Sequence, residues 1–266
     1  MGVSGFLKQV IEIKQEEIER SRQRISLQTI RGDAEQTDTP ASFLTALSAS
    51  APDHIGIIAE VKKASPSKGD IRPDLDCVQF AENYTEAGAR AISVLTESRF
   101  FKGSLMDLET VCRHTGLPVL RKDFTLSSYQ IYEAKRAGAS SILLIVTLLS
   151  RDQLTDYIHL VRELGMEPLV EINSEKELET ACTCDARVIG INNRNLETLE
   201  TDLDVSKRIS PLIPGTIVRV EASGISSRKD IDQGVKSGFY NFLVGESIVR
   251  ADDTKGFIQS LIHPHT

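Results

Sequence analysis

The stretch IGIIAEVKKASPSKGDI, residues 55–71, puts charge where an apolar run meets a turn. Glu60, Lys62 and Lys63 stand at the end of the run, just before a Ser-Pro-Ser-Lys-Gly loop. A buried charge is costly unless it is paired or used. Interleaved Lys and Glu side chains pair and shift one another's pKa values, which is typical of functional sites. The end of this run is therefore a candidate site.

Three later apolar runs also end in a polar residue. In each run this residue lies on the same face of the strand as the residue two positions before it. Side chains of a strand alternate between its two faces. The sets on one face are Ile58, Glu60 and Lys62; Leu120 and Lys122; Leu169 and Glu171; Gly190 and Asn192. If these faces point inward, two carboxylates, two ammonium groups and an amide converge on one mouth. Lys63 alternates outward, and we interpret it as structural.

Eight short β-branched runs must position these residues. They alternate with polar helical patterns and read IGIIAEV, AISVLTE, LPVLRKDF, SSILLIVTLL, EPLVEIN, RVIGINN, TIVRVEAS and NFLVGES. Strands that alternate with helices predict a parallel sheet. Eight units over about 210 residues match an α/β fold of the (β/α)8 TIM barrel type, whose active site lies at the carboxyl ends of the strands. A doubly wound open sheet is the alternative, but no run is followed by a G-x-G-x-x-G turn.

A helical segment precedes the first strand. Residues 5–30 show the apolar spacing of an amphipathic helix, RGDAEQTDTP is a polar break, and ASFLTALSAS predicts a second short helix. We therefore expect one domain over residues 1–266, in which residues 1–50 form an N-terminal helical extension packed on the barrel. Glycines that end three helical patterns, Gly88, Gly138 and Gly238, are predicted C-caps that lead into strands.

The last two strands are each followed by a glycine, in ASGI (222–225) and LVGES (243–247). In barrels of this kind the loops after strands seven and eight often hold a phosphate through backbone N–H groups. Simple turn chemistry is the alternative. The candidate phosphate-binding residues are Ser223, Gly224, Gly245, Glu246 and Ser247.

Composition and charge exclude several classes of protein. The formal net charge of −7 argues against an overall basic footprint for nucleic acid, and no apolar run approaches the roughly 20 residues of a membrane span. Four cysteines are few for a disulfide framework in 266 residues, so we expect a reduced, cytoplasmic protein. We interpret Cys182 and Cys184 as residues of a helix end and the HPHT tail as a frayed terminus, and we expect no metal.

Six segments carry a resemblance to a known family. SFLTAL, IAEVKKASPSKG, LPVLRKDF, PLVEI, IGINNRNLETL and LVGESIVR resemble, in order, the motifs of indole-3-glycerol phosphate synthase, a tryptophan-pathway barrel. The resemblance implies a carboxy-lyase without metal or organic cofactor. Its substrate would be 1-(2-carboxyphenylamino)-1-deoxyribulose 5-phosphate, which closes to indole-3-glycerol phosphate with loss of CO2 and water. It also leaves open an association with other enzymes of that pathway.

The resemblance also implies roles. Lys122 would be the general acid of ring closure, Glu171 the base of dehydration, and Lys62 a contact to the anionic substrate that can also donate a proton. Glu60 and Asn192 would hold the lysines and substrate hydroxyls. The sequence leaves open which lysine serves which step.

Two loops could supply further substrate contacts. Ser65 of the Ser-Pro-Ser loop could contact the benzoate carboxylate, whereas we interpret Ser67 and Lys68 as a surface turn. Arg194 could approach that carboxylate or support Glu60, or form a salt bridge on the rim.

One segment departs from the family pattern. The family ends strand seven with Glu-Ser-Gly, whereas this chain reads VEASGI, so Ala222 fills the position of the acid and Glu221 comes one residue early. Because side chains alternate between the two faces of a strand, we expect Glu221 to point outward together with Arg219, close enough to form an ion pair with it. A bulge that turns Glu221 inward is the alternative.

Two other functions remain at this point. A related phosphate-binding sugar isomerase would share the glycine loops, but such enzymes use a carboxylate or thiol pair where this chain has Glu-x-Lys. A non-catalytic barrel scaffold would lack polar residues at the mouth, and this chain has them.

Overall fold

The computed structural model describes residues 5–38 and 40–263, and its centre is a closed barrel of eight parallel strands. The strands are β1 (Gly56–Val61), β4 (Ala91–Leu95), β5 (Val119–Lys122), β6 (Ser141–Ile145), β7 (Leu169–Ile172), β8 (Val188–Asn192), β9 (Val218–Ala222) and β10 (Asn241–Val244). They are hydrogen-bonded in sequence order, and β10 closes the barrel by pairing with β1. The predicted (β/α)8 barrel with all eight strands is confirmed, and the open sheet is wrong.

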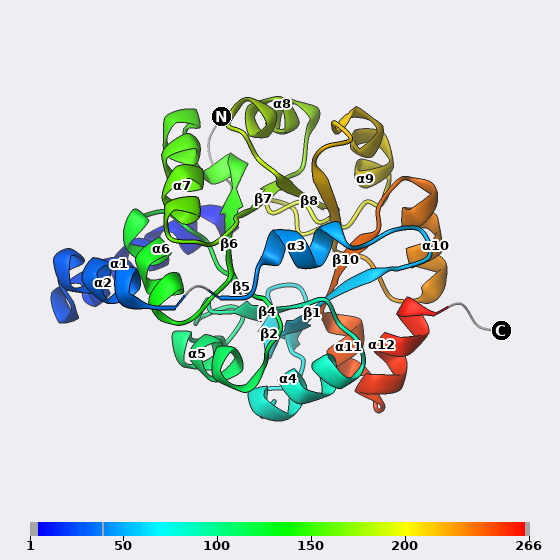
Figure 1. Cartoon of the computed structure of the whole chain (residues 1–266), viewed down its shortest axis with the longest axis horizontal. Coiled ribbons are helices and arrows are strands. Elements are labelled where there is room, and N and C mark those ends of the chain that lie inside the picture. The colour runs from blue at the N-terminus through cyan, green and yellow to red at the C-terminus, as the bar shows by residue number, and fades with distance from the viewer. Residues whose placement is uncertain (1–4, 39, 264–266) are drawn as a thin grey trace.

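Helices surround the strands (Figure 1). They are α4 (Cys77–Glu86), α5 (Leu105–His114), α6 (Ser128–Arg136), α7 (Arg151–Glu163), α8 (Glu175–Thr183), α9 (Asp204–Ile209), α10 (Arg228–Lys236), α11 (Glu246–Arg250) and α12 (Thr254–Ile262), with 3-10 turns at Val146–Leu148 and Ser210–Leu212. The predicted glycine caps are confirmed, because Gly88, Gly138 and Gly238 follow helix ends with φ of 88°, 87° and 84°. Only glycine adopts this left-handed conformation without cost, so each helix turns sharply into the next strand.

The core has two layers. The interior cluster fills the barrel with one residue set from the strands, including Ile58, Leu120, Leu143, Leu169 and Val220. The alternate residues, such as Ile57 and Ala59 of β1, pack outward in the cluster under the helices. The apolar residues on the predicted inward face of each strand therefore do point inward. The polar residues on the same faces can reach the mouth for this reason.

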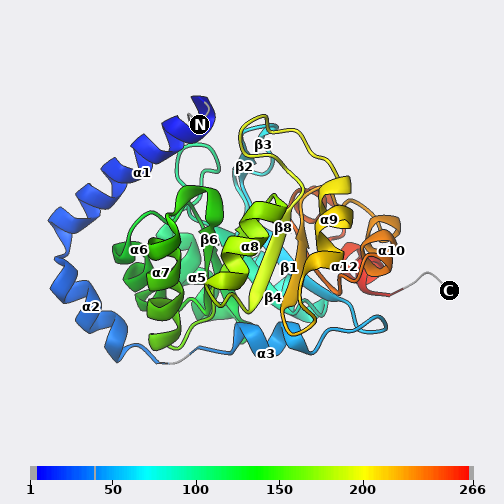
Figure 2. The same ribbon diagram turned by 90° about the horizontal axis from the view of Figure 1, so that it is seen from above.

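The N-terminal extension contacts both ends of the barrel. It consists of α1 (Gly5–Arg24), α2 (Leu27–Gln36) and α3 (Phe43–Ser48). Figure 2 shows α1 along one side of the barrel and α3 across the bottom of the barrel in that view. Leu7 and Val10 of α1 and Phe43 and Leu47 of α3 belong to the interior cluster.

The predicted bounds of the first helix are wrong. One helix over 5–30 is in fact two, because Ser26 leaves the helical conformation and its hydroxyl caps α2 by accepting from the Thr29 N–H. Helix α2 then continues to Gln36, through most of the segment predicted as a polar break. The short helix predicted within 41–50 is confirmed as α3.

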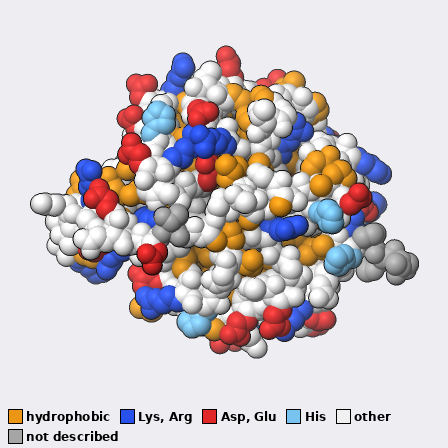
Figure 3. Space-filling model, viewed as in Figure 1, with side chains coloured by type: hydrophobic (Ala, Val, Ile, Leu, Met, Phe, Trp, Pro, Cys, Tyr) orange, Lys and Arg blue, Asp and Glu red, His pale blue; other side chains and the backbone are white. Residues whose placement is uncertain are grey.

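The remaining sequence features lie on the outside of the barrel. Acidic and basic side chains are interspersed on the face seen in Figure 3. Helix α8 ends at Thr183 with Cys184 as its C-cap, so the Cys182–Cys184 pair does lie at a helix end.

Within residues 5–38 and 40–263 there is no helix long and apolar enough to cross a membrane and no group of three metal-binding side chains. The tail histidine at position 265 lies outside the described residues.

Candidate active site

The carboxyl ends of the strands bring the predicted polar residues around one cavity of about 720 Å³. Lys62 follows β1, Lys122 ends β5, Glu171 lies in β7 and Asn192 ends β8, and all four line this cavity. Glu60 lies one layer deeper in β1 and is 2% exposed. Apolar walls with a few converging polar groups are typical of a small-molecule site.

Glu60 is a buried carboxylate held by cations. Its Oε1 lies 2.6 Å from Lys62 Nζ, and Ser93 Oγ donates to Oε2 at 3.5 Å. Burial opposes ionisation, but the ammonium groups of Lys62 and Lys122 outweigh it and lower the pKa of Glu60 below its usual value. Glu60 is therefore an anion that fixes Lys62, and it is a poor proton acceptor.

A second carboxylate is held by a chain of hydrogen bonds. Glu171 is 4% exposed, its Oε2 lies 3.7 Å from Lys122 Nζ, and its Oε1 accepts from Asn192 Nδ2 at 3.0 Å. Asn192 Oδ1 in turn accepts from Ser223 Oγ at 2.8 Å and from the Arg194 N–H at 3.0 Å. These bonds orient the Asn192 amide so that its donor points at Glu171.

Apolar side chains make up the rest of the cavity wall, and sequence reasoning missed them. The lining residues of this kind are Phe6, Leu95, Phe101, Phe124, Leu143, Ile145, Leu196 and Leu199. The signal was present in SRFFKG, where two adjacent phenylalanines stand in the loop after β4. Such walls suit an aromatic ring.

The loop that carries Phe101 is held by one carboxylate. Glu97 accepts hydrogen bonds from the backbone N–H groups of Arg99, Phe100 and Phe101 at 2.9, 2.7 and 3.0 Å. A carboxylate with several N–H donors fixes a tight loop. The ring of Phe101 lies 6.0 Å from Lys62 Nζ, so Glu97 also fixes the wall beside that lysine.

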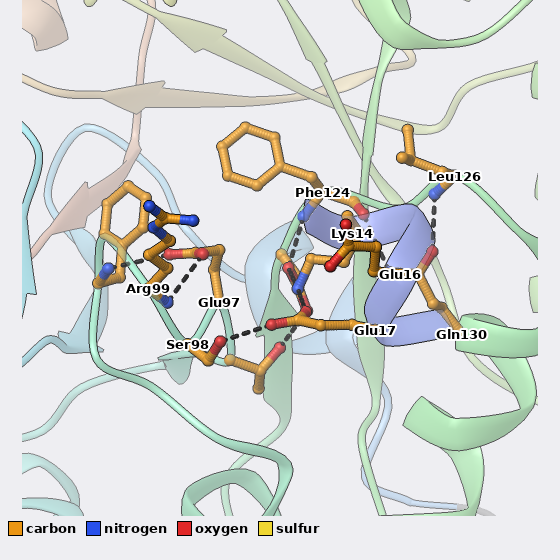
Figure 4. A network of polar contacts seen from close by, with 12 residues as sticks. Lys14, Glu16, Glu17, Glu97, Ser98, Arg99, Phe124, Leu126 and Gln130 are labelled. Carbon is orange, nitrogen blue, oxygen red and sulfur yellow. Dashed lines mark hydrogen bonds and ion pairs between the residues drawn. The ribbon is translucent and has the colours of Figure 1, made fainter. Parts of the chain in front are cut away.

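Helix α1 is attached to the rim of the site by a buried ion pair (Figure 4). Lys14 Nζ lies 2.8 Å from Asp123 Oδ1 and 2.6 Å from Glu17 Oε2, and Glu17 accepts from Ser98 Oγ. Burial disfavours the Asp123 carboxylate, but the charges of Lys14 and Arg121 lower its pKa. Because Asp123 directly follows Lys122, the extension contacts the segment that carries this lysine.

The Ser-Pro-Ser segment is a small hairpin that was predicted only as a loop. Strands β2 (Ala64–Ser65) and β3 (Gly69–Asp70) pair antiparallel at the mouth. Ser65 is 7% exposed, lines the cavity, and its hydroxyl has no hydrogen-bond partner among the described residues. A buried hydroxyl without a partner is rare, so Ser65 Oγ is free to bond to a ligand.

Arg194 lies at the cavity, but its two predicted protein partners, Glu60 and a rim carboxylate, are wrong. It donates to Ser67 Oγ at 3.2 Å and to the Leu199 carbonyl at 3.1 Å, and it pairs neither with Glu60 nor with a rim carboxylate in the described part of the chain. Ser67 is exposed, as a surface turn requires, yet it also lines the cavity. Lys63 points outward and pairs with Asp107 at 2.8 Å, which confirms its structural interpretation.

The glycine turns border a second cavity of about 940 Å³ beside the first. It is lined by Ser223, Gly224, Gly245, Glu246 and Ser247 and shares Lys62 and Lys122 with the first cavity. The N–H groups of Gly224 and Gly245 have no acceptor within residues 5–38 and 40–263. Glu246 pairs with Arg250 at 3.1 Å, and Ser247 Oγ donates to the Ile225 carbonyl, so their side chains have protein partners.

Glycine is required at both turns for steric reasons. Gly224 has a φ of 87°, and a Cβ at Gly245 would lie 2.4 Å from Glu60 Oε1. Any side chain at residue 245 would therefore displace the carboxylate that fixes Lys62.

The seventh strand of the barrel, β9, carries Glu221 and Ala222 and has a regular geometry. Ile191 is the β8 partner of Glu221 and Asn192 that of Ala222, in continuous register, so the bulge is wrong. Ala222 faces the second cavity, and Glu221 points outward as predicted. The ion pair with Arg219 is also wrong. Glu221 Oε1 accepts instead from Ser206 Oγ at 2.5 Å and Asn193 Nδ2 at 3.0 Å, while Arg219 donates to the Ile213 carbonyl at 2.7 Å.

Because Glu221 lies outside the mouth, Glu221→Gln is expected to leave kcat within a few-fold. Burial raises the pKa of Glu221 despite its hydrogen bonds. The folded state therefore holds this proton more tightly than the unfolded state, and the carboxyl costs stability as pH rises from its unfolded pKa through its raised folded pKa. Urea unfolding from about pH 4 to about pH 8 should show that this decline is smaller in Glu221→Gln. A fall in kcat of ~10²-fold would contradict the outward position.

Comparison with known proteins is consistent with this geometry. A family profile described as indole-3-glycerol phosphate synthase matches residues 7–261. An indole-3-glycerol phosphate synthase of Desulfosudis oleivorans is 45% identical over 261 residues, which is 98% of this chain and 99% of that protein. A multifunctional tryptophan biosynthesis protein of Schizosaccharomyces pombe is 45% identical over 212 residues, covering 78% of this chain and 28% of that protein.

A solved structure, thiamine phosphate pyrophosphorylase from Pyrococcus furiosus, shares the fold with a TM-score of 0.59 and 14% identity, covering 79% of this chain and 95% of that one. The family profile and the Desulfosudis protein extend over nearly the whole chain, including every strand end that lines the two cavities. The chain therefore belongs to the indole-3-glycerol phosphate synthase family.

Proposed function

We propose that the mouth of this barrel performs the family's ring closure with Lys122 as general acid and Glu171 as general base. The observation that carries the proposal is the set of bonds Lys62–Glu60 and Lys122–Glu171–Asn192–Ser223 at the junction of an apolar cavity and a glycine-lined one. An anilino sugar phosphate has the matching parts, which are an aromatic ring, a reactive ketone and a phosphate. No contact among the described residues favours the sugar isomerase or the scaffold.

The benzoate part would occupy the cavity of about 720 Å³. Phe101, Phe124 and the leucines around them offer apolar faces to the ring. Ser65 Oγ, which lacks a protein partner in the described residues, and the Arg194 guanidinium would bind the carboxylate. The phosphate would lie in the neighbouring cavity at Gly224 and Gly245 through Ser247.

Ring closure needs an acid at the ketone. The aromatic carbon that bears the carboxylate attacks the ketone carbon, and Lys122 Nζ gives a proton to the oxygen. Loss of CO2 returns the C–C bonding electrons to the ring, which becomes aromatic again. Glu60 holds Lys62 in place beside the same cavity.

Dehydration then needs an acid and a base. The new hydroxyl accepts a proton from Lys62 and leaves as water, while Glu171 removes the proton from the carbon next to nitrogen. The electrons of that C–H bond form the double bond of the indole. Asn192, fixed by Ser223, holds Glu171 in position for this step.

The reaction itself can be followed by indole fluorescence. Purified protein with 1-(2-carboxyphenylamino)-1-deoxyribulose 5-phosphate should generate the indole signal at the same rate with and without a chelator. A loss of activity that added metal restores would contradict cofactor-independent chemistry, and no signal under either condition would contradict the proposed function.

Inorganic phosphate and sulfate should compete with the substrate, because the glycine turns offer N–H donors without another acceptor. A crystal soaked in sulfate should hold the anion beside Gly224 and residues 245–247. An anion bound elsewhere with this position empty would contradict the assignment, and unchanged KM at high phosphate would do so in solution.

Three broader proposals concern the domain organisation, the location and the partners of the protein. We propose that residues 1–266 act as one domain with residues 1–50 as its extension, since α1 and α3 both contribute to the interior cluster. The biosynthetic role of the family supports a cytoplasmic location. The multifunctional relative supports an association with other tryptophan-pathway enzymes.

A further inference from the structure

We propose that Lys68, at the tip of the β2–β3 hairpin, is the cation that binds the substrate phosphate. This inference rests on the proposed phosphate position at Gly224 and Gly245. It assigns to that subsite a cationic side chain beside the backbone donors of the two glycine turns. Lys68 lines the same cavity as these two glycines.

Four consecutive residues of the hairpin line the two cavities. Ser65, Pro66 and Ser67 line the apolar cavity, and Lys68 lines the glycine-rich one. The change of direction occurs at Gly69, which has a φ of 64° and pairs with Ser65 across the hairpin. One short segment can therefore contact the carboxylate end and the phosphate end of a single ligand.

The hairpin is held on both sides, so the backbone position of Lys68 is defined by its neighbours. Arg194 on the β8–α9 loop donates to Ser67 Oγ at 3.2 Å. Asp70 forms an ion pair with Lys102 on the β4–α5 loop. The N–H of Ile71 returns to the Lys63 carbonyl at 2.9 Å and closes the base of the hairpin.

The charges around the two cavities leave Lys68 without a protein anion. Lys62 pairs with Glu60, Lys122 lies near Glu171, and Arg250 pairs with Glu246; the fourth cation, Arg194, donates to neutral oxygens. Lys68 forms no ion pair in the part of the chain that the structure describes. A phosphate monoester carries about −1.5 to −2 charges near neutral pH, and lysine binds phosphate as a point charge.

A phosphate remote from the reacting atoms contributes binding energy in the ground state and the transition state alike. Loss of such a contact raises KM and leaves kcat nearly unchanged. Lys68→Met, which retains the length and removes the charge, should raise KM by ~10- to 100-fold with kcat within a few-fold. Lys68→Arg should restore most of the affinity.

The test measures KM, kcat and the inhibition constant of inorganic phosphate for the wild type, Lys68→Met and Lys68→Arg. The matched control is Lys236→Met, an exposed lysine at the carboxyl end of α10, at the opposite end of the barrel. A second substrate ends in a hydroxyl in place of the phosphate. We expect Lys68→Met to weaken phosphate inhibition and to have the same kcat/KM as the wild type on the hydroxyl substrate.

The outcomes separate this inference from the proposed function. If phosphate inhibits the wild type and Lys68→Met equally, or if Lys68→Met loses as much on the hydroxyl substrate as on the phosphate substrate, Lys68 does not bind the phosphate. If phosphate does not inhibit the wild type at all, the subsite at Gly224 and Gly245 is wrong and Lys68 has no role there. A wild type that forms no indole overturns the proposed function itself.

Discussion

Replacing Lys122 with methionine should lower kcat by at least ~10²-fold, the scale expected when a general acid is lost. Lys122 ends β5 in the inward phase and points its ammonium group into the cavity, 3.7 Å from Glu171 Oε2. Methionine keeps the apolar stem and removes the proton donor. The change in KM should be smaller than the change in kcat, because the proposed contacts to the carboxylate and phosphate remain.

The measurement is steady-state indole fluorescence, with Lys236→Met as the control for removal of a lysine far from the site. Circular dichroism and thermal unfolding verify that Lys122→Met is folded. Turnover near that of the wild type would exclude Lys122 as the acid of ring closure. In that case Lys62, which lines the same cavity, becomes the candidate for that step.

The sequence predicts the barrel and most of the mouth because both follow from the alternation of side chains between the two faces of each strand. A strand buried on both faces has one set of side chains in the barrel and the other under the helices, as Ile58 and Ile57 show. Once Ile58 points inward, Glu60 and Lys62 must follow at the same face. The same argument places Glu221 outward, and the continuous pairing of β8 with β9 agrees with it.

Contacts between segments far apart in the chain could not be predicted in this way. Spacing brings Glu221 close to Arg219, but Ser206 and Asn193 come from α9 and the β8–α9 loop and supply better hydrogen bonds. Arg194 likewise bonds to Ser67, 127 residues away, instead of to a carboxylate of the protein. Such partners depend on how loops of different units meet at the rim.

The apolar walls were missed for a related reason. Phe101 lies in a loop after β4, where neither helical nor strand periodicity applies, and its position depends on three N–H bonds to Glu97. The end of the first helix was missed because a single hydroxyl cap at Ser26 interrupts a pattern that continues on both sides.

Glu171→Gln should lower kcat by ~10²- to 10³-fold by removing the base of dehydration. The substitution preserves the surroundings, since a glutamine oxygen can still accept from Asn192 Nδ2, which now lies 3.0 Å from Oε1. What is lost is the negative charge beside Lys122 and the ability to take a proton. Exposed Glu179 on α8 gives the matched control, Glu179→Gln.

A single-turnover experiment assigns Glu171 to its step, because CO2 leaves before water in the proposed sequence. In Glu171→Gln, CO2 should form well ahead of the indole signal, since the decarboxylated alcohol waits for a base. In Lys122→Met both signals should be slowed together, because ring closure precedes both. If CO2 and indole appear with one slow rate in Glu171→Gln, the carboxylate acts at or before ring closure, through its contact with Lys122, and the order of roles proposed for the two residues is wrong.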